Sequence, residues 1–245
     1  MSRLRLSGVG VEKRFGRVTA LHNIDFEIAP GESVAILGAN GAGKSTWLRL
    51  LAGLAKPSAG RFVAEASEGA GPAVPIPRER LRGRVGYVGH ATLLHAELTA
   101  RENLVFAARL HDLRPTRAEQ DALFAELGLA EFAERRVGAL SRGTAQRVSI
   151  ARSLVHDPDL LLLDEPFTGL DEISAERLSH RLARLRRQGR ALVVVTHDPQ
   201  RAVELADRAL LLHRGRLQAP GPFEAAALRD RLLHLAREEG AGERA

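Results

Sequence analysis

The chain has 245 residues, 44% of them apolar, which is enough to bury a substantial hydrophobic core. It contains no cysteine, so disulfide bonds and thiolate metal sites are excluded. The net charge of +6 comes almost entirely from arginines that are interspersed with glutamates. That pattern is typical of solvated helix faces, and we therefore expect no nucleic-acid partner.

The sequence also shows no sign of a membrane-spanning helix or of a signal peptide. No run approaches the roughly 18 to 20 apolar residues that a membrane-spanning helix requires. The longest runs, Leu160–Leu163 and Ala191–Val195, have the length of buried strands, and Met1–Leu6 contains no apolar signal core. We therefore expect a cytosolic protein with no transmembrane segment of its own.

The chain begins with two alternating segments, Leu4–Val11 and Thr19–Ile28, joined by a turn at Phe15–Arg17. Alternation of apolar and polar residues predicts an antiparallel hairpin. Two interpretations of Phe15 remain open: its ring anchors the loop in the core, or it stacks on the adenine of a nucleotide held by the segment that follows.

A glycine-rich loop, Gly38–Thr46, lies between the apolar run Ser33–Leu37 and a helical segment that ends at Gly53. Glycines let backbone N–H groups face phosphates, and a helix N-terminus adds its positive dipole end. This order of strand, loop and helix predicts a site for nucleotide phosphates and Mg²⁺, in which the lysine contacts the phosphates and the serine holds the metal. The expected nucleotide-binding residues in this loop are Gly38, Asn40, Gly41, Gly43, Lys44, Ser45 and Thr46.

The middle of the chain changes from strands to helices. Strands are predicted at Gly60–Glu65 and Arg84–Val88, separated by a loop rich in glycine and proline. Apolar spacing near 3.6 then predicts helices from Glu102, over Arg117–Leu127 and over Leu129–Val137, with no strand between them. We expect a helical insertion in an α/β protein.

Two carboxylates, Asp164 and Glu165, end the apolar strand that begins at Leu160. Acids at the carboxyl end of a buried strand require a cationic partner. Mg²⁺ held also by Ser45 is the natural partner of Asp164, while Glu165 can orient or deprotonate an attacking water. His197 follows the next predicted strand and is expected in the same layer, near Glu165 or a γ-phosphate.

The remaining elements are a serine-capped helix and a C-terminal region. Ser141 precedes the helix predicted at Val148–His156, where a serine and a glycine make an end that suits an anion but is also typical of an ordinary cap. A hairpin at Ala209–Leu217, a helix at Phe223–Glu239 and a frayed tail at Gly240–Ala245 are expected to complete the chain.

These motifs in this order resemble the ATP-binding-cassette (ABC) ATPases over essentially the whole chain. Gly38–Thr46 matches the family's phosphate loop, Leu160–Glu165 its carboxylate strand and His197 its switch histidine. The resemblance implies an α/β P-loop NTPase fold with a mixed core sheet and an N-terminal antiparallel β subdomain. It also implies a single domain over residues 1–245, with a helical subdomain inserted at about 91–156.

The resemblance assigns roles to these residues. It implies ATP and Mg²⁺ as cofactors, with Lys44, Glu165 and His197 acting in hydrolysis and Phe15 stacking on adenine. It further implies that Ser141 and Gly143 of a signature segment contact ATP held by a second subunit, in a head-to-tail homodimer around two MgATP. Asp171 would lie in the loop that contacts that second subunit.

Two positions depart from the family pattern. In the signature, Arg142 replaces a glycine and Thr144 replaces a glutamine, although Ser141 and Gly143 are kept. His90 stands where the family has a glutamine that links Mg²⁺ and water to the helical subdomain. A histidine there can coordinate the metal or form a hydrogen bond in a similar way.

A further resemblance is to the ATPase subunit of cytochrome c maturation transporters of the heme-exporter type, and it is carried by Tyr87–His90, Glu97–Leu104, Leu140–Gly143 and Asp164–Asp171. This implies separate membrane permease subunits (CcmB/CcmC-like) and a peripheral location on the cytoplasmic face of the inner membrane. Whether heme is pumped or a heme-carrier complex is released stays open. An exporter of another small molecule, or an ABC ATPase acting on nucleic acid or ribosomes, is the alternative.

Overall fold

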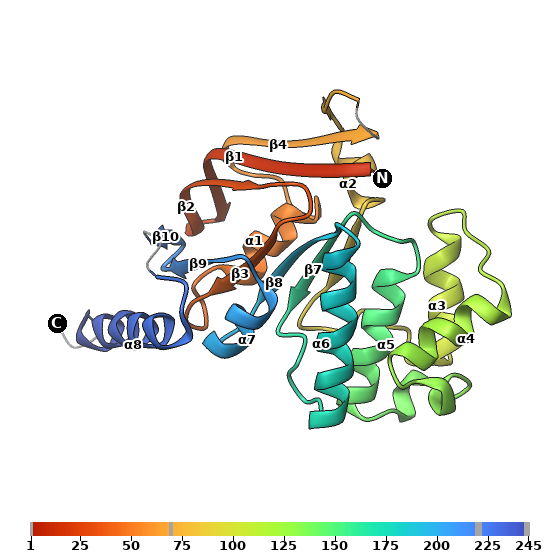
Figure 1. Cartoon of the computed structure of the whole chain (residues 1–245). Coiled ribbons are helices and arrows are strands. Elements are labelled where there is room, and N and C mark those ends of the chain that lie inside the picture. The colour runs from red at the N-terminus through yellow and green to blue at the C-terminus, as the bar shows by residue number, and fades with distance from the viewer. Residues whose placement is uncertain (1, 69–70, 219–221, 243–245) are drawn as a thin grey trace.

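Two β-sheets lie side by side in the computed structural model, which describes residues 2–68, 71–218 and 222–242 (Figure 1). The first sheet is antiparallel, with the strand order β2-β1-β4-β5. Its long β1–β2 hairpin forms where alternation was predicted, and the inward side chains of Leu4, Leu6 and Val11 are buried. Its strands are β1 (Ser2–Phe15), β2 (Val18–Ile28), β4 (Ala59–Glu68) and β5 (Val74–Pro75).

The second sheet has the order β10-β9-β3-β8-β7-β6, and only β10 runs antiparallel to its neighbour. Every residue of β3, β7 and β8 is buried, as expected for parallel strands covered on both faces. The carboxyl ends of β3, β7 and β8 therefore meet at one edge. The strands are β3 (Ser33–Leu37), β6 (Val85–Val88), β7 (Leu160–Asp164), β8 (Ala191–Val195), β9 (Arg208–His213) and β10 (Arg216–Gln218).

The helices cover this second sheet from both sides (Figure 1). Helix α1 buries Trp47 and Leu48 in one hydrophobic cluster that also includes Leu6 of β1 and Ile36 of β3. Helices α3 to α6 bury a separate cluster against the other face. The helices are α1 (Lys44–Leu51), α2 (Arg78–Arg82), α3 (Ala100–Arg109), α4 (Arg117–Glu126), α5 (Arg142–Leu154), α6 (Glu172–Arg187), α7 (Pro199–Leu205) and α8 (Ala225–Gly242).

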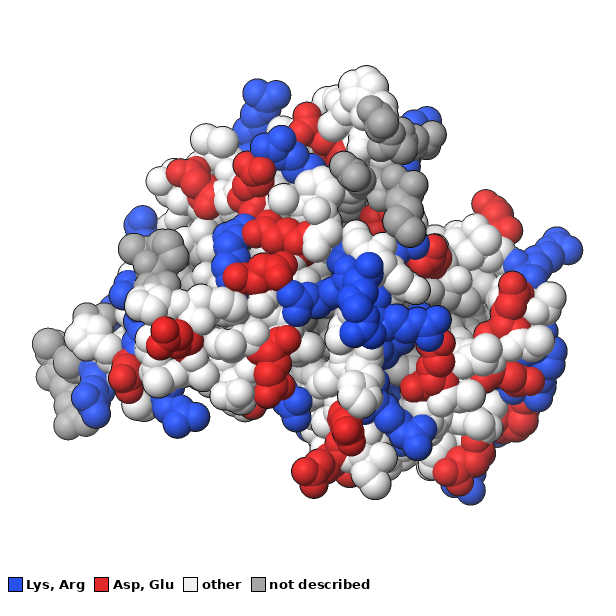
Figure 2. All heavy atoms as spheres, in the orientation of Figure 1, with Lys and Arg blue, Asp and Glu red and all other residues white. Residues whose placement is uncertain are grey.

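This arrangement confirms the predicted α/β class, with an antiparallel N-terminal sheet, a mixed core sheet and helices inserted between β6 and β7. Among the described residues, no helix is both long and apolar enough to cross a membrane. Figure 2 shows acidic and basic side chains near one another over most of the face that it draws, and a run of basic side chains near its centre. On α6, Arg181 and Arg184 each form an ion pair with Glu126 of α4, at 2.7 and 2.8 Å.

The helix predicted at Leu129–Val137 is wrong. The segment forms two short 3₁₀ turns, Ala130–Phe132 and Val137–Ala139. Its backbone bonds instead to the chain before α3, where the N–H of Val137 donates to the carbonyl of Leu98 at 2.9 Å. These long-range bonds leave too few local partners for a continuous helix.

Other helices also differ from the sequence predictions. Helix α5 begins at Arg142 rather than Val148, because Ser141 caps it directly. The short helix α2 was not predicted. Helix α8 continues through Gly242, so the expected frayed tail is wrong for residues 240–242, and residues 243–245 lie outside the described ranges.

Candidate functional site

The phosphate loop occupies the bend between β3 and α1, as its sequence predicts. Gly43, with φ of +104°, precedes α1, and a Cβ there would lie 2.6 Å from the carbonyl oxygen of Ala20. Only glycine fits such a conformation and such a close approach. Lys44 Nζ donates to the carbonyl oxygens of Gly38 and Ala39 at 2.6 and 2.7 Å. The loop thus surrounds an ammonium group at a helix N-terminus, which is an arrangement that binds phosphates.

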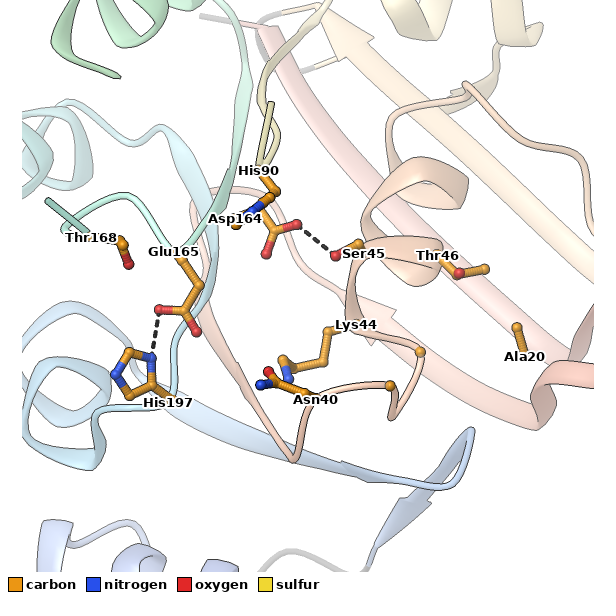
Figure 3. A pocket seen from close by; sticks show the side chains of 12 residues that line it. Ala20, Asn40, Lys44, Ser45, Thr46, His90, Asp164, Glu165, Thr168 and His197 are labelled. Atoms are coloured by element: carbon orange, nitrogen blue, oxygen red, sulfur yellow. Dashed lines mark hydrogen bonds and ion pairs between the residues drawn. The ribbon is translucent and has the colours of Figure 1, made fainter. Parts of the chain in front are cut away.

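A cavity of about 370 Å³ opens above this loop (Figure 3). Most of the predicted site residues converge on it from β3–α1, β6, β7 and β8. Two residues that sequence reasoning missed, Ala20 and Thr168, also line it. Thr168 could have been predicted, because it lies only three residues after Glu165 and a polar side chain there is close to the site. No feature of the sequence around Ala20 indicates that it lines the cavity. The predicted residues in the lining are Asn40, Gly41, Gly43, Lys44, Ser45, Thr46, His90, Asp164, Glu165 and His197.

Ser45 and Asp164 meet on one side of the cavity. The hydroxyl of Ser45 donates to Asp164 Oδ2 at 2.7 Å, across two elements that are 119 positions apart in the chain. Asp164 is only 5% exposed. In the described ranges, no group of three or more His, Cys, Asp or Glu side chains is placed so that it could hold a metal. One carboxylate and one hydroxyl fit Mg²⁺, which takes few protein oxygens and completes its shell with water and substrate phosphates.

Glu165 and His197 meet on another side. His197 Nδ1 lies 3.0 Å from Glu165 Oε2, and Glu165 lies between His197 and Lys44 (Figure 3). Glu165 has φ of +50°, an uncommon conformation for a non-glycine residue, and its N–H donates to the carbonyl oxygen of Val195 at 3.0 Å. A carboxylate held over the loop by a neighbouring strand can accept a proton from water, and the imidazole can orient that carboxylate.

Phe15 does not line the cavity. Its ring is 52% exposed at the end of β1, and Lys13 Nζ lies 5.0 Å from the ring centre. A loop-anchoring role in the core is therefore wrong, because such a ring would be buried. On the paired strand β2, Ala20 lines the cavity, and stacking of Phe15 on adenine stays a prediction.

The signature residues also lie outside the cavity lining, at the start of α5. The hydroxyl of Ser141 accepts the N–H of Thr144 at 3.2 Å and lies 2.9 Å from the Thr144 hydroxyl. Arg142 is exposed. Gly143 packs tightly against the loop after β7, since a Cβ there would lie 2.4 Å from the carbonyl oxygen of Gly169. One copy of the chain therefore does not bring its signature to its own phosphate loop.

Asp171 ends the same loop and caps α6. Its carboxylate accepts the N–H of Ser174 at 2.8 Å and the Ser174 hydroxyl at 3.0 Å. The bond from the Ser174 N–H, followed by that from its hydroxyl, holds the pKa of Asp171 below its usual range, and the charge of Arg147 acts in the same direction. In this structure Asp171 has a structural role as a helix cap.

Comparison with known proteins identifies the class of this site. A family model described as ABC transporter matches residues 21–168. The chain is 36% identical over 211 residues to the ABC transporter ATP-binding protein NatA of Bacillus subtilis (strain 168), covering 85% of this chain and 84% of that protein. This chain belongs to the ABC transporter family.

Other ABC relatives are similar at the same level. The chain is 39% identical over 240 residues to the aliphatic sulfonates import ATP-binding protein SsuB 1 of Xanthomonas axonopodis pv. citri (strain 306), covering 91% of this chain and 88% of that protein. It is 38% identical over 213 residues to the Nod factor export ATP-binding protein I of Burkholderia orbicola (strain AU 1054), covering 86% of this chain and 68% of that protein.

Solved ABC structures share the fold. The dimeric, post-hydrolysis structure of the ATP-binding cassette MJ0796 bound to ADP and Pi has a TM-score of 0.75 and 29% identity, and the match covers 89% of this chain and 99% of that chain. A bacterial Atm1-family ABC exporter with ATP bound has a TM-score of 0.80 and 27% identity, covering 97% of this chain and 42% of that chain. The chain is therefore an ABC-type ATPase whose cofactors are ATP and Mg²⁺.

Proposed function

We propose that this chain is the ATP-hydrolysing motor subunit of a transporter and works as a head-to-tail pair around two MgATP. The observation that carries the proposal is the convergence of the Ser45–Asp164 and Glu165–His197 pairs on one phosphate loop. The position of the signature, outside the cavity of its own chain, supports the need for a second copy. The dimeric MJ0796 structures support that arrangement.

Within each site, the chain's own residues divide the work. Lys44 and the loop N–H groups bind the phosphates and stabilise charge that develops on them. Glu165 orients the attacking water and accepts its proton, while His197 holds the Glu165 carboxylate in place. Ser45 and Asp164 would hold Mg²⁺, which would supply positive charge against the phosphates when bound.

In the proposed pair, each site is completed from the second copy. Ser141 and Gly143 at the start of α5 present backbone N–H groups and the positive end of a 13-residue helix. Those groups would contact the γ-phosphate held by the other copy, with Arg142 and Thr144 beside them. Phe15 would stack on adenine, and Asp171 would lie in the loop between the two copies.

We also propose that the motor acts on separate membrane subunits from the cytoplasmic face of the inner membrane. The exposed apolar side chains of Leu93, Phe106 and Leu110, on and around α3, support a docking surface there. The finer proposal is a cytochrome c maturation system, with CcmB/CcmC-like subunits, that exports heme or releases a heme carrier. Its support is the sequence of Tyr87–His90 and Leu140–Gly143. The alternative is an exporter of another small molecule, which is supported by relatives that include a Nod factor export ATP-binding protein.

The replacement Glu165→Gln tests the motor. It removes the proton acceptor while keeping the size of the side chain, so ATP turnover is expected to fall about 100-fold or more while MgATP still binds. Size-exclusion chromatography with light scattering should show that the variant dimerises in MgATP. Glu176→Gln, at an exposed position on α6, is the matched control and should keep the wild-type rate. A Glu165→Gln protein that hydrolyses ATP at the normal rate contradicts the role of Glu165.

The Glu165→Gln variant also tests which membrane subunits the chain binds. Affinity purification of Glu165→Gln from native membranes in MgATP, followed by mass spectrometry and a heme absorbance scan, should recover membrane subunits of the cytochrome c maturation type. Recovery of a different permease would keep the motor and reject heme. Recovery of ribosomes or DNA without a membrane protein would reject transport.

A further inference from the structure

Three polar side chains form a row of hydrogen bonds at the start of α5. The hydroxyl oxygens of Ser141 and Thr144 lie 2.9 Å apart, and Nη2 of Arg147 donates to the Thr144 hydroxyl at 3.4 Å. The backbone N–H of Thr144 also donates to Ser141 Oγ, at 3.2 Å. Thr144 is 5% exposed, whereas Ser141 is exposed. The row therefore leads from the interior of the helical insertion to its surface.

Arg147 is held at the inner end of this row. Its Nη1 donates to the carbonyl oxygens of Leu127 and Gly128, at 3.1 and 2.8 Å, directly after the end of α4. Its guanidinium carbon lies 5.9 Å from the centre of the Phe132 ring. These contacts position the other end of the guanidinium beside the Thr144 hydroxyl.

The chemistry of the three groups sets the direction of their hydrogen bonds. A guanidinium donates but cannot accept, so the Thr144 oxygen is the acceptor in its bond with Arg147. In the described part of the chain, the proton of the Thr144 hydroxyl then has one acceptor within reach, which is Ser141 Oγ. Ser141 Oγ therefore accepts two bonds from Thr144, one from its hydroxyl and one from its N–H. Both lone pairs of the Ser141 oxygen are used, and its proton is left to donate outward.

We propose that Thr144 is a positioning residue for the signature, whose hydroxyl keeps the Ser141 proton directed at a γ-phosphate oxygen of the ATP held by the second copy. The inference rests on the proposed function. A hydrogen bond to a charged phosphate is stronger than one between neutral groups, and a hydroxyl that already accepts hydrogen bonds is a better donor. Without the Thr144 hydroxyl, Ser141 loses one of the two bonds that orient and polarise it.

Pairing is measured in the Glu165→Gln background with saturating MgATP, as the dissociation constant of the dimer in analytical ultracentrifugation. Thr144→Val removes the hydroxyl and keeps the shape of the side chain. Each pair contains two signature contacts, and each is expected to weaken about threefold, so the dissociation constant should rise about tenfold. Thr144→Ser keeps the hydroxyl and should pair as tightly as the parent protein. Thr144→Ala also lacks the hydroxyl and suits a helix, so it replaces the valine variant if that protein does not fold.

A second set of measurements separates positioning from a general effect on the helix. In a Ser141→Ala background the proposed donor is gone, so Thr144→Val should have no further effect on the dissociation constant, whereas a merely structural role would weaken pairing equally in both backgrounds. MgADP binding, measured by calorimetry, should be equal in all variants because Thr144 lies outside the cavity lining. Ser153→Ala is the matched control and should keep the tight pair. It removes another buried hydroxyl of α5, which donates to the carbonyl oxygen of Ile150 at 2.8 Å.

The outcomes distinguish this inference from the function on which it rests. A Glu165→Gln protein that does not pair in MgATP would reject the proposed pair, and this inference with it. If the parent protein pairs and Thr144→Val pairs as tightly, the inference is overturned and the motor stands. An equal loss with and without Ser141→Ala, or a Thr144→Ser protein that pairs as weakly as Thr144→Val, would overturn it as well.

Discussion

Two histidines stack at the junction between the helical insertion and the core sheet, and they make stability depend on pH. The rings of His111, after α3, and His156, after α5, lie 3.9 Å apart with an interplanar angle of 1°. His156 Nε2 lies 3.3 Å from the carbonyl oxygen of Val85, and its Nδ1 is buried without a hydrogen-bond partner in the described part of the chain. Protonation of His156 would therefore place a charge where water cannot solvate it.

Burial, followed by the neighbouring charge of His111, lowers the pKa of His156 from 6.5 to about 4. The bond to Val85 and the charge of Asp157 oppose this shift, while Arg152 adds to it. Burial also lowers the pKa of His111, against the charge of Asp112.

Because the unfolded chain binds the proton more readily, stability is fully present above pH 6.5 and is lost as the pH falls toward 4. The loss approaches about 1.4 kcal/mol per pH unit within that window and amounts to about 2 kcal/mol between pH 7.5 and 5.0.

Urea unfolding at pH 7.5 and pH 5.0 measures this loss. His156→Phe keeps an aromatic ring against His111 but does not titrate, so its free energy of unfolding should fall by about 2 kcal/mol less than that of the wild type over this range. The comparison concerns the pH dependence alone, so any constant cost of the substitution cancels. His180→Gln, exposed on α6, should behave like the wild type. Equal pH dependence of wild type and His156→Phe would refute the reasoning.

Two further predictions concern the site. Lys44→Ala should lower ATPase activity by about 100-fold or more, because it removes the charge that stabilises the phosphates, whereas Lys56→Ala, exposed outside the cavity, should keep the wild-type rate. Gly143→Ala should abolish MgATP-dependent dimerisation in the Glu165→Gln background, because its Cβ would lie 2.4 Å from a backbone oxygen. Gly83→Ala, whose Cβ would meet no atom closer than 3.6 Å, should still dimerise, and dimers of both variants would contradict the expected clash.

The core of the site could be predicted because it is encoded locally. The phosphate loop and the Asp164–Glu165 pair each lie within a few residues of an apolar strand, and parallel strands bring their carboxyl ends to one edge. The segment Leu129–Val137 could not be predicted, because its backbone partners lie more than 30 positions earlier, around Leu98. Helical spacing in the sequence carries no information about such partners.

Arginine 101 shows the same limit for side chains. The sequence suggested that arginines cover solvated faces, but Arg101 is 9% exposed. Its guanidinium bonds to Asp121 and Glu134, both at 2.7 Å, and to Gln120 at 3.1 Å. A buried arginine is tolerated where such partners surround it, and these partners come from segments 19 to 33 positions away.

The contact between Gly143 and Gly169 suggests how two sites in a pair would be linked. The loop that begins after Asp164 carries Glu165 to the cavity of its own chain, and four residues later it packs against the signature. In the proposed pair that signature covers the nucleotide of the other copy. A change in the loop when Glu165 acts on one ATP would therefore be transmitted through a rigid backbone contact to the second ATP. Hydrolysis at one site would then weaken the contact between the signature and the ATP at the other site. A motor whose two copies separate after turnover requires such a weakening.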